Sequence, residues 1–182
     1  LLSRRQRQMC IRDRESFNDD LAVSGLLSDE KMDDVLKRHE DTLKFMFLQT
    51  WTNSSWTPEE EEDAQSMLIS ELLPVNDLCL FISAVTLSLM ECFDLRKVMW
   101  LLDAYRHPDV NASQRALVGV IFIFHIYRNR LSLYPDLIKR VEFMDEISSF
   151  QEDVARIYHQ MLLCQETEKI DTVSYTHLRA HE

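Results

Sequence analysis

The sequence predicts an all-α protein built from stacked antiparallel helical hairpins, and three observations support this fold class. The 182-residue chain contains only two glycines and four prolines, too few for a turn-rich β protein. Apolar residues recur at the three- and four-residue spacing of one helix face. The prolines fall where these apolar segments begin or end. A hydrophobic content of 46% also argues against disorder.

The first predicted helix spans residues 29–50. Ser28 is a suitable N-cap because its hydroxyl can accept a hydrogen bond from a free N–H of the first turn. Asp29 and Glu30 then lie at the positive end of the helix dipole, where carboxylates are stabilising. One face of the helix is apolar and carries Met32, Val35, Leu36, Leu43, Met46 and Phe47.

The second predicted helix spans residues 58–73 and starts with a capping box. Thr57 is its N-cap, Pro58 occupies the first helical position, and Glu60 completes the box. The acidic residues that follow belong to the first turns of a helix, which is a more ordinary reading than a cation site. We expect this helix to form a hairpin with the first around the loop 51–56.

Three helices follow, over residues 77–93, 95–106 and 111–129. Asn76 and Asp94 are the expected N-caps of the first two. The helices 77–93 and 111–129 are apolar on nearly every side, which predicts burial on both sides.

These two apolar segments raise the question of a membrane. Leu78–Phe93 and Ala116–Tyr127 are both shorter than the roughly 20 residues that span a bilayer. We therefore expect core helices and no membrane span. A membrane-associated helical domain would need Leu78–Phe93 to face lipid.

Two more helices complete the prediction. One begins near Pro135, and the last begins with a second capping box from Ser149 to Glu152. Helices that begin near residues 77, 111 and 149 recur at intervals typical of stacked helical repeats, in which one hairpin cannot bury its apolar face alone.

The stretch Val98–Tyr127 resembles a HEAT-type repeat. It contains an apolar helix, the turn Pro108-Asp109, and a second helix with Arg115 near its start. In that family, a turn aspartate and a helical arginine form a stacking ladder between repeats. The resemblance implies this structural role for Asp109 and Arg115.

Three short segments are similar to parts of long bacterial tetratricopeptide-repeat proteins, in which a helical region precedes the repeats. They are Ser113–Gly119, Arg130–Pro135 and Glu166–Ile170, and the tetratricopeptide signature itself is absent. Proteins of both repeat families are mostly scaffolds. The resemblance therefore implies an α-solenoid fragment that serves as a non-catalytic scaffold or protein-interaction region of a larger protein. The alternative is an all-helical enzyme domain.

Both ends of the chain resemble translated sequencing adapters. We therefore expect residues 15–172 to be one α-helical repeat-like domain, truncated at both ends, and residues 1–14 and 173–182 to be non-native tails. His177 and His181 have the spacing of two metal ligands on one helix face, but they lie in the second tail. No metal site is expected.

The charge balance disfavours nucleic-acid binding. The chain has 20 basic and 31 acidic residues, a net charge of −11. The two tails hold six arginines against Asp13 and Glu182, so residues 15–172 hold 14 basic and 29 acidic residues, net −15. Binding to a phosphate backbone needs clustered lysine and arginine. We expect a protein partner instead.

The sequence predicts neither catalytic residues nor a cofactor. It contains no glycine-rich phosphate loop, no nucleophile elbow and no grouping of serine, histidine and aspartate. We expect His107, His125 and His159 to be a capping, a core and a surface histidine, respectively.

The cysteines favour a cytoplasmic protein. Outside the tails they are Cys79, Cys92 and Cys164, without a C-x-x-C pair, so neither disulfides nor a thiolate metal site is expected. Each lies in an apolar helical stretch, which predicts three small buried thiols.

Two tryptophans are the candidates for partner contact. Trp51 and Trp56 flank the polar loop 52–55, and tryptophan is enriched at binding hot spots. They could equally join the two flanking helices to each other.

Gly119 lies inside an apolar helix, where it costs about 1 kcal/mol relative to alanine. Close approach of a neighbouring helix is the expected reason.

Overall fold

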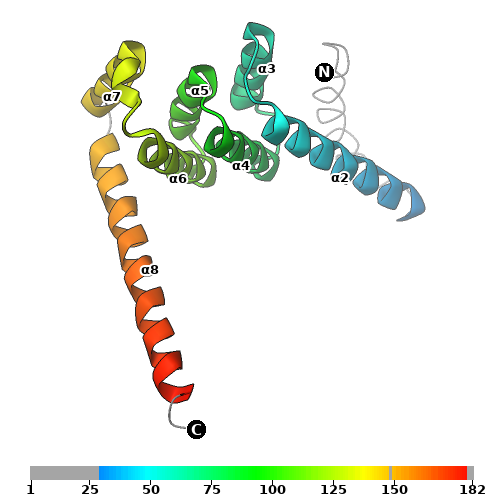
Figure 1. Cartoon of the computed structure of the whole chain (residues 1–182). Coiled ribbons are helices and arrows are strands. Elements are labelled where there is room, and N and C mark those ends of the chain that lie inside the picture. The colour runs from blue at the N-terminus through cyan, green and yellow to red at the C-terminus, as the bar shows by residue number, and fades with distance from the viewer. Residues whose placement is uncertain (1–28, 148, 180–182) are drawn as a thin grey trace. The chain divides into compact units, whose positions relative to one another are not determined.

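The structure, a computed structural model, describes residues 29–147 and 149–179, and within these ranges every regular element is helical (Figure 1). The all-α prediction is confirmed, and each of the seven predicted helices is present. The chain divides into two compact units, up to Arg130 and from Leu131. Ser28, both ends of the chain and the side chains beyond residue 164 lie outside what is described.

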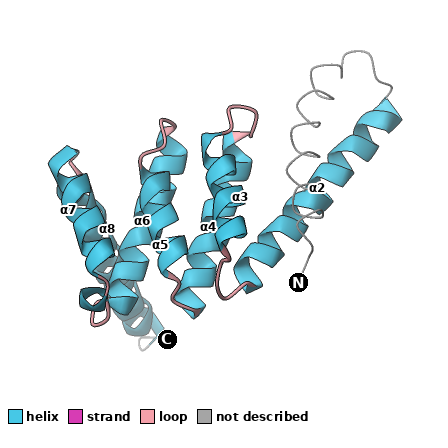
Figure 2. Cartoon of the chain, turned by 90° about the horizontal axis from the view of Figure 1, so that it is seen from above, coloured by secondary structure: helices cyan, strands magenta, loops and turns pink. Residues whose placement is uncertain are grey.

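The first unit contains five helices, which Figure 2 shows as a series: α2 (Asp29–Thr52), α3 (Pro58–Ile69), α4 (Val75–Glu91), α5 (Leu95–Tyr105) and α6 (Val110–Tyr127). The second unit contains the short 3-10 helix η2 (Leu131–Leu133), α7 (Pro135–Ile147) and α8 (Phe150–Arg179). The helical α8 thus continues into the segment 173–179 that resembles an adapter.

Two helix starts agree with the expected caps. The Thr57 hydroxyl accepts from Glu60 N at 3.3 Å, and Glu60 Oε2 accepts from Thr57 N at 2.8 Å, so the capping box is confirmed. Asp94 Oδ1 accepts from Arg96 N at 2.9 Å and caps α5.

One other expected cap is wrong. Asn76 cannot cap α4 because that helix already begins at Val75, behind Pro74, without a side-chain cap. α8 begins at Phe150, directly after Ser149 as expected, and Asp145 of the preceding helix accepts from Gln151 N at 3.2 Å. The Ser149 hydroxyl donates to Asp153 at 3.5 Å, and the capping box with Glu152 stays a prediction.

The expected hairpin between the first two helices is also wrong. α2 packs on α4, and α3 packs on α5. The loop between α2 and α3 carries Trp56 into the interior, where its ring contacts α4 and α5. Because this contact anchors the loop, α3 reaches α5 and does not fold back along α2.

α4 is buried on both sides, as its all-round apolar sequence predicts. It packs on α2, α5 and α6, and Ile82, Ala84, Val85 and Leu89 are fully buried. α6 packs on α4 and α5. By length and composition alone, α6 is also the one helix in the described ranges that could cross a membrane, a property it shares with many core helices.

Gly119 lies where α6 meets α4 and α5 closely. A Cβ atom at this position would overlap Thr86 Oγ1 and would lie 3.2 Å from Leu101 Cδ2. The close approach expected from the sequence is confirmed. A residue with a side chain would fit here only if Thr86 moved.

Candidate functional site

The most structured cluster of polar groups joins the end of α2 to α4 and α5. We call it the Trp56 junction and define it as Asn53, Trp56, Ser88, Asp94 and Lys97. The loop after α2 supplies the first two residues, and the end of α4 and the start of α5 supply the other three.

Trp56 is the aromatic centre of the junction and is 7% exposed. Its ring stacks on Phe81 of α4, with centroids 6.3 Å apart, and meets the edge of Trp100 of α5 at 5.8 Å. Phe81 and Trp100 also meet edge to face at 5.2 Å. Such aromatic pairs add to the hydrophobic burial of their rings. The three rings therefore hold the loop, α4 and α5 together.

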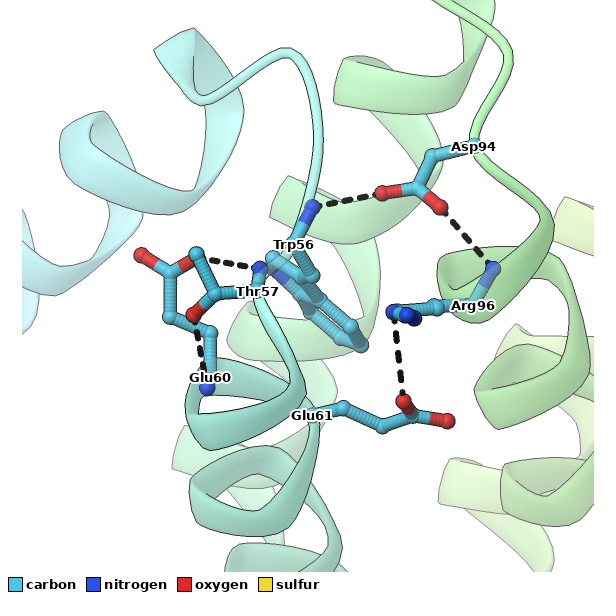
Figure 3. A network of polar contacts seen from close by, with 6 residues as sticks. All are labelled: Trp56, Thr57, Glu60, Glu61, Asp94 and Arg96. Carbon is cyan, nitrogen blue, oxygen red and sulfur yellow. Dashed lines mark hydrogen bonds and ion pairs between the residues drawn. The ribbon is translucent and has the colours of Figure 1, made fainter.

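Asp94 connects the same loop to the start of α5 (Figure 3). One carboxylate oxygen accepts from Trp56 N at 2.6 Å, and the other caps the helix at Arg96 N. The Arg96 guanidinium in turn lies 3.5 Å from the carboxylate of Glu61 on α3. A single buried carboxylate thus satisfies two backbone donors that would otherwise need water.

Lys97 has a fully buried side chain. Its ammonium donates to Asn53 O and, at 2.7 Å, to Ser88 Oγ, and it lies 5.7 Å above the Trp56 ring centre. The Ser88 hydroxyl also donates to Asn53 O at 2.7 Å. Because Asn53 directly follows α2, the cation sits at the negative end of that helix dipole.

Burial lowers the pKa of Lys97, and the nearby carboxylates of Asp94 and Glu60 oppose this shift. The amine is enclosed by a carbonyl, a hydroxyl and an indole face, with no exposed surface. These groups can hold a charge and fix the ends of three helices. They leave no side for a substrate to approach.

A second polar contact between α2 and α4 lies away from the junction. His39 Nε2 is 3.3 Å from Asp77 Oδ2, and both side chains are nearly buried. Neither residue was predicted from the sequence, and Lys97 was not predicted either. Lys97 carries a usable signal, because it stands four residues before Leu101 on the apolar face of α5. A lysine at a core position predicts a buried partner.

The two candidate tryptophans lie in different environments. Trp51 is 40% exposed on α2, and among the described residues its ring neighbour is Phe47, at 6.1 Å. Trp56 is buried in the junction, so its ring is not available to a partner. The interior aromatic contacts of Trp56 explain the difference, and the partner-contact hypothesis is retained for Trp51 alone.

Asp109 and Arg115 do not bond to each other. Asp109 Oδ1 accepts from Asn111 N at 2.9 Å and Ala112 N at 3.2 Å, which caps α6. Arg115 Nη1 donates to Ser83 Oγ of α4 at 2.9 Å. The arginine therefore joins adjacent helices, as a stacking residue would, but its acceptor is a serine in place of the turn aspartate.

The histidine expectations are met in part. His107 Nδ1 accepts from Asp109 N at 3.1 Å and so caps the turn, and His159 is exposed, as expected. His125 is exposed, so the core expectation is wrong, because it lies on a face of α6 that neither α4 nor α5 covers.

The cysteine expectation holds for one thiol of three. Cys79 is buried, and desolvation raises the pKa of its thiol. Cys92, at the end of α4, and Cys164, on α8, are exposed. Among the described residues, no group of three or more His, Cys, Asp or Glu side chains could hold a metal ion.

The acidic run at the start of α3 has specific partners. Glu60 closes the capping box and accepts from Asn53 Nδ2 at 3.2 Å, and Glu61 faces Arg96. These contacts support the interpretation of the acidic run as a helix start.

In comparisons with known proteins, no protein-family model, no curated protein and no solved structure matches the chain.

Proposed function

We propose that the helices of the first unit are part of a short HEAT- or tetratricopeptide-like α-solenoid, which acts as a non-catalytic scaffold or protein-interaction region of a larger cytoplasmic protein. The observation that carries this proposal is the packing of alternate helices. α2 packs on α4 and α4 on α6, while α3 packs on α5. In a solenoid, each repeat buries its apolar face against the next, and the helices form two rows of this kind.

Exposed apolar side chains on one row support an interaction role. They occur on all three helices of that row: Phe45, Leu48 and Trp51 on α2, Leu87 and Met90 on α4, and Phe122 and Ile126 on α6. Soluble proteins expose extended apolar surface mainly where they bind partners. Lys97, the titratable group that an enzyme hypothesis would favour, is enclosed and serves packing.

Hydrogen exchange tests the solenoid part of the proposal. Stability in a solenoid is a sum of unit and nearest-neighbour contributions, so protection is graded along the stack. We expect amides of α4 and α5 to exchange most slowly and those of α2 to exchange faster. Exchange of all five helices at one common rate would indicate a cooperative globular bundle and contradict the proposal.

Photo-crosslinking tests the interaction part. Benzoylphenylalanine is placed in separate variants at Leu48, Leu87 and Ile126, with exposed polar Ser66 on α3 as the matched control. After irradiation in a bacterial host, we expect a discrete protein adduct from at least one apolar position and none from position 66. Equal adducts from all four positions, or none, would count against an interaction surface on this row.

A further inference from the structure

We propose that the face of α2 formed by Phe45, Leu48 and Trp51 docks a basic amphipathic helix of a partner protein. This inference rests on the proposed interaction function and adds the place and the chemistry of the partner. We call these three side chains the α2 face.

The α2 face points away from the rest of the unit. Met46 and Thr50 are 7% and 8% exposed, respectively, and lie on the side of α2 that packs on α4. Leu48 is two residues from each of them, a rotation of about 200°, and so lies on the opposite side. In Figure 1, α4 lies beside α2 at the packed side.

The side chains of the α2 face form a continuous apolar strip. Phe45, Leu48 and Trp51 are 42%, 52% and 40% exposed, respectively. Their three-residue spacing makes one of the ridges that pack into the groove of a second helix. A ridge of this kind suits a helical occupant.

Charge identifies the chemistry of that occupant. α2 and α3 together contain eleven acidic and four basic residues, and the last turn of α2 has no basic residue. Glu60 of α3 bonds to Asn53, which places the acidic start of α3 next to the end of α2 that carries Trp51. Glu59 and Glu62 are exposed there. A partner helix with lysine or arginine beside its apolar stripe complements this surface.

A second copy of the chain fits the α2 face less well. A second copy would bring a second net charge of −11 to the interface. Like charges oppose such an association, and they favour the basic partner.

Fluorescence anisotropy of a labelled probe tests the inference. The probe is a short leucine–lysine peptide that folds as a basic amphipathic helix, and its leucine–glutamate counterpart is the charge control. We expect the full chain to bind the basic probe and not the acidic one. Leu48→Ser is expected to weaken binding about tenfold, because the leucine side chain loses its apolar contact. Ile69→Ser, at a position that is 73% exposed on α3, is expected to leave binding unchanged.

Each other result overturns the inference. Equal binding of both probes would show that the partner need not be basic. Equal binding of the basic probe by the Leu48→Ser and Ile69→Ser variants would show that the α2 face is not the docking site. Sedimentation that shows dimers of the full chain, lost in Leu48→Ser, would make a second copy the occupant. Crosslinking at Leu87 or Ile126 without probe binding would leave the proposed interaction function standing and refute this docking surface alone.

Discussion

The backbone N–H of Trp56 donates a 2.6 Å hydrogen bond to Asp94 Oδ2, although the two residues are 38 positions apart in the chain. This bond brings the loop after α2 to the start of α5. It also fixes the path by which α3 reaches its own neighbour. The bond between these two residues therefore helps to hold α3 next to α5.

Asp94→Ala is expected to destabilise the protein more than the loss of a helix cap alone. Removing the carboxylate deprives α5 of its cap, worth about 1 kcal/mol, and leaves the buried N–H of Trp56 unpaired at a further cost of about 1–3 kcal/mol. Urea unfolding measures the total. Asp109→Ala is the matched control, because that carboxylate caps α6 without a long-range bond. Equal losses in the two variants would show that the Trp56 bond contributes nothing.

The lowered pKa of Lys97 predicts a pH dependence of stability with a definite sign. Between that lowered pKa and the ordinary lysine value of 10.5, the unfolded chain binds more protons at this position than the folded chain. The contribution of Lys97 to the free energy of unfolding therefore rises with pH through this window. It is lost as pH falls through the folded pKa.

Comparing the wild type with Lys97→Met isolates this contribution. Burial also raises the pKa values of Cys79 and Tyr127, but both groups are present in the two proteins, so their effects cancel in the difference between the two free energies of unfolding. The wild type should gain stability relative to the variant as pH increases toward 10.5, as measured by urea unfolding at several pH values. If the difference in free energy of unfolding stays constant with pH, or changes in favour of the variant, burial does not lower the pKa of Lys97.

Alkylation should distinguish the buried Cys79 from the exposed Cys92 and Cys164. Cys92 and Cys164 are exposed, while Cys79 is buried with a raised pKa, and the thiolate is the reactive form. Iodoacetamide in native buffer should modify the first two well before Cys79. Mass spectrometry of the digested protein reports each site, and denatured protein provides the control in which all three react. Fast native labelling of Cys79 would contradict its burial.

Gly119→Ala should destabilise the protein although alanine is the better helix former. The added methyl group overlaps Thr86 Oγ1 and crowds Leu101, and overpacking of this kind costs about 1–3 kcal/mol. Thermal or urea unfolding measures the loss. Thr86→Ala in the same chain removes the obstructing hydroxyl and methyl groups, so the double variant should recover much of the stability. Without such recovery, the contact between α4 and α6 would not be the cause.

The helices and several of their starts could be predicted because their signals are local. Thr57 with Glu60, and Asp94, cap their helices through residues only two or three positions away. A capping box or a periodic apolar face needs no knowledge of the rest of the fold. Asn76 failed as a cap because Pro74 permits the helix to start two residues earlier than expected.

The pairing of helices could not be predicted, because it depends on contacts between distant residues. The hairpin expected from the short loop is replaced by the burial of Trp56 against Phe81 and Trp100. The polar residues before that tryptophan are typical of a surface loop. No local sequence pattern indicates that its ring contacts α4 and α5. Lys97, in contrast, was visible as a charge on an apolar face and was overlooked.

The acceptor shared by Lys97 and Ser88 is the main-chain carbonyl of Asn53, which any amino acid at that position would provide. Substitutions at position 53 can therefore accumulate without loss of this bond, whereas the serine and the lysine must be kept or change together. With Asp94 between them, they give the spacing Ser-x5-Asp-x2-Lys. Distant homologues too divergent for whole-chain comparison can be sought by this spacing across the junction of two apolar helices.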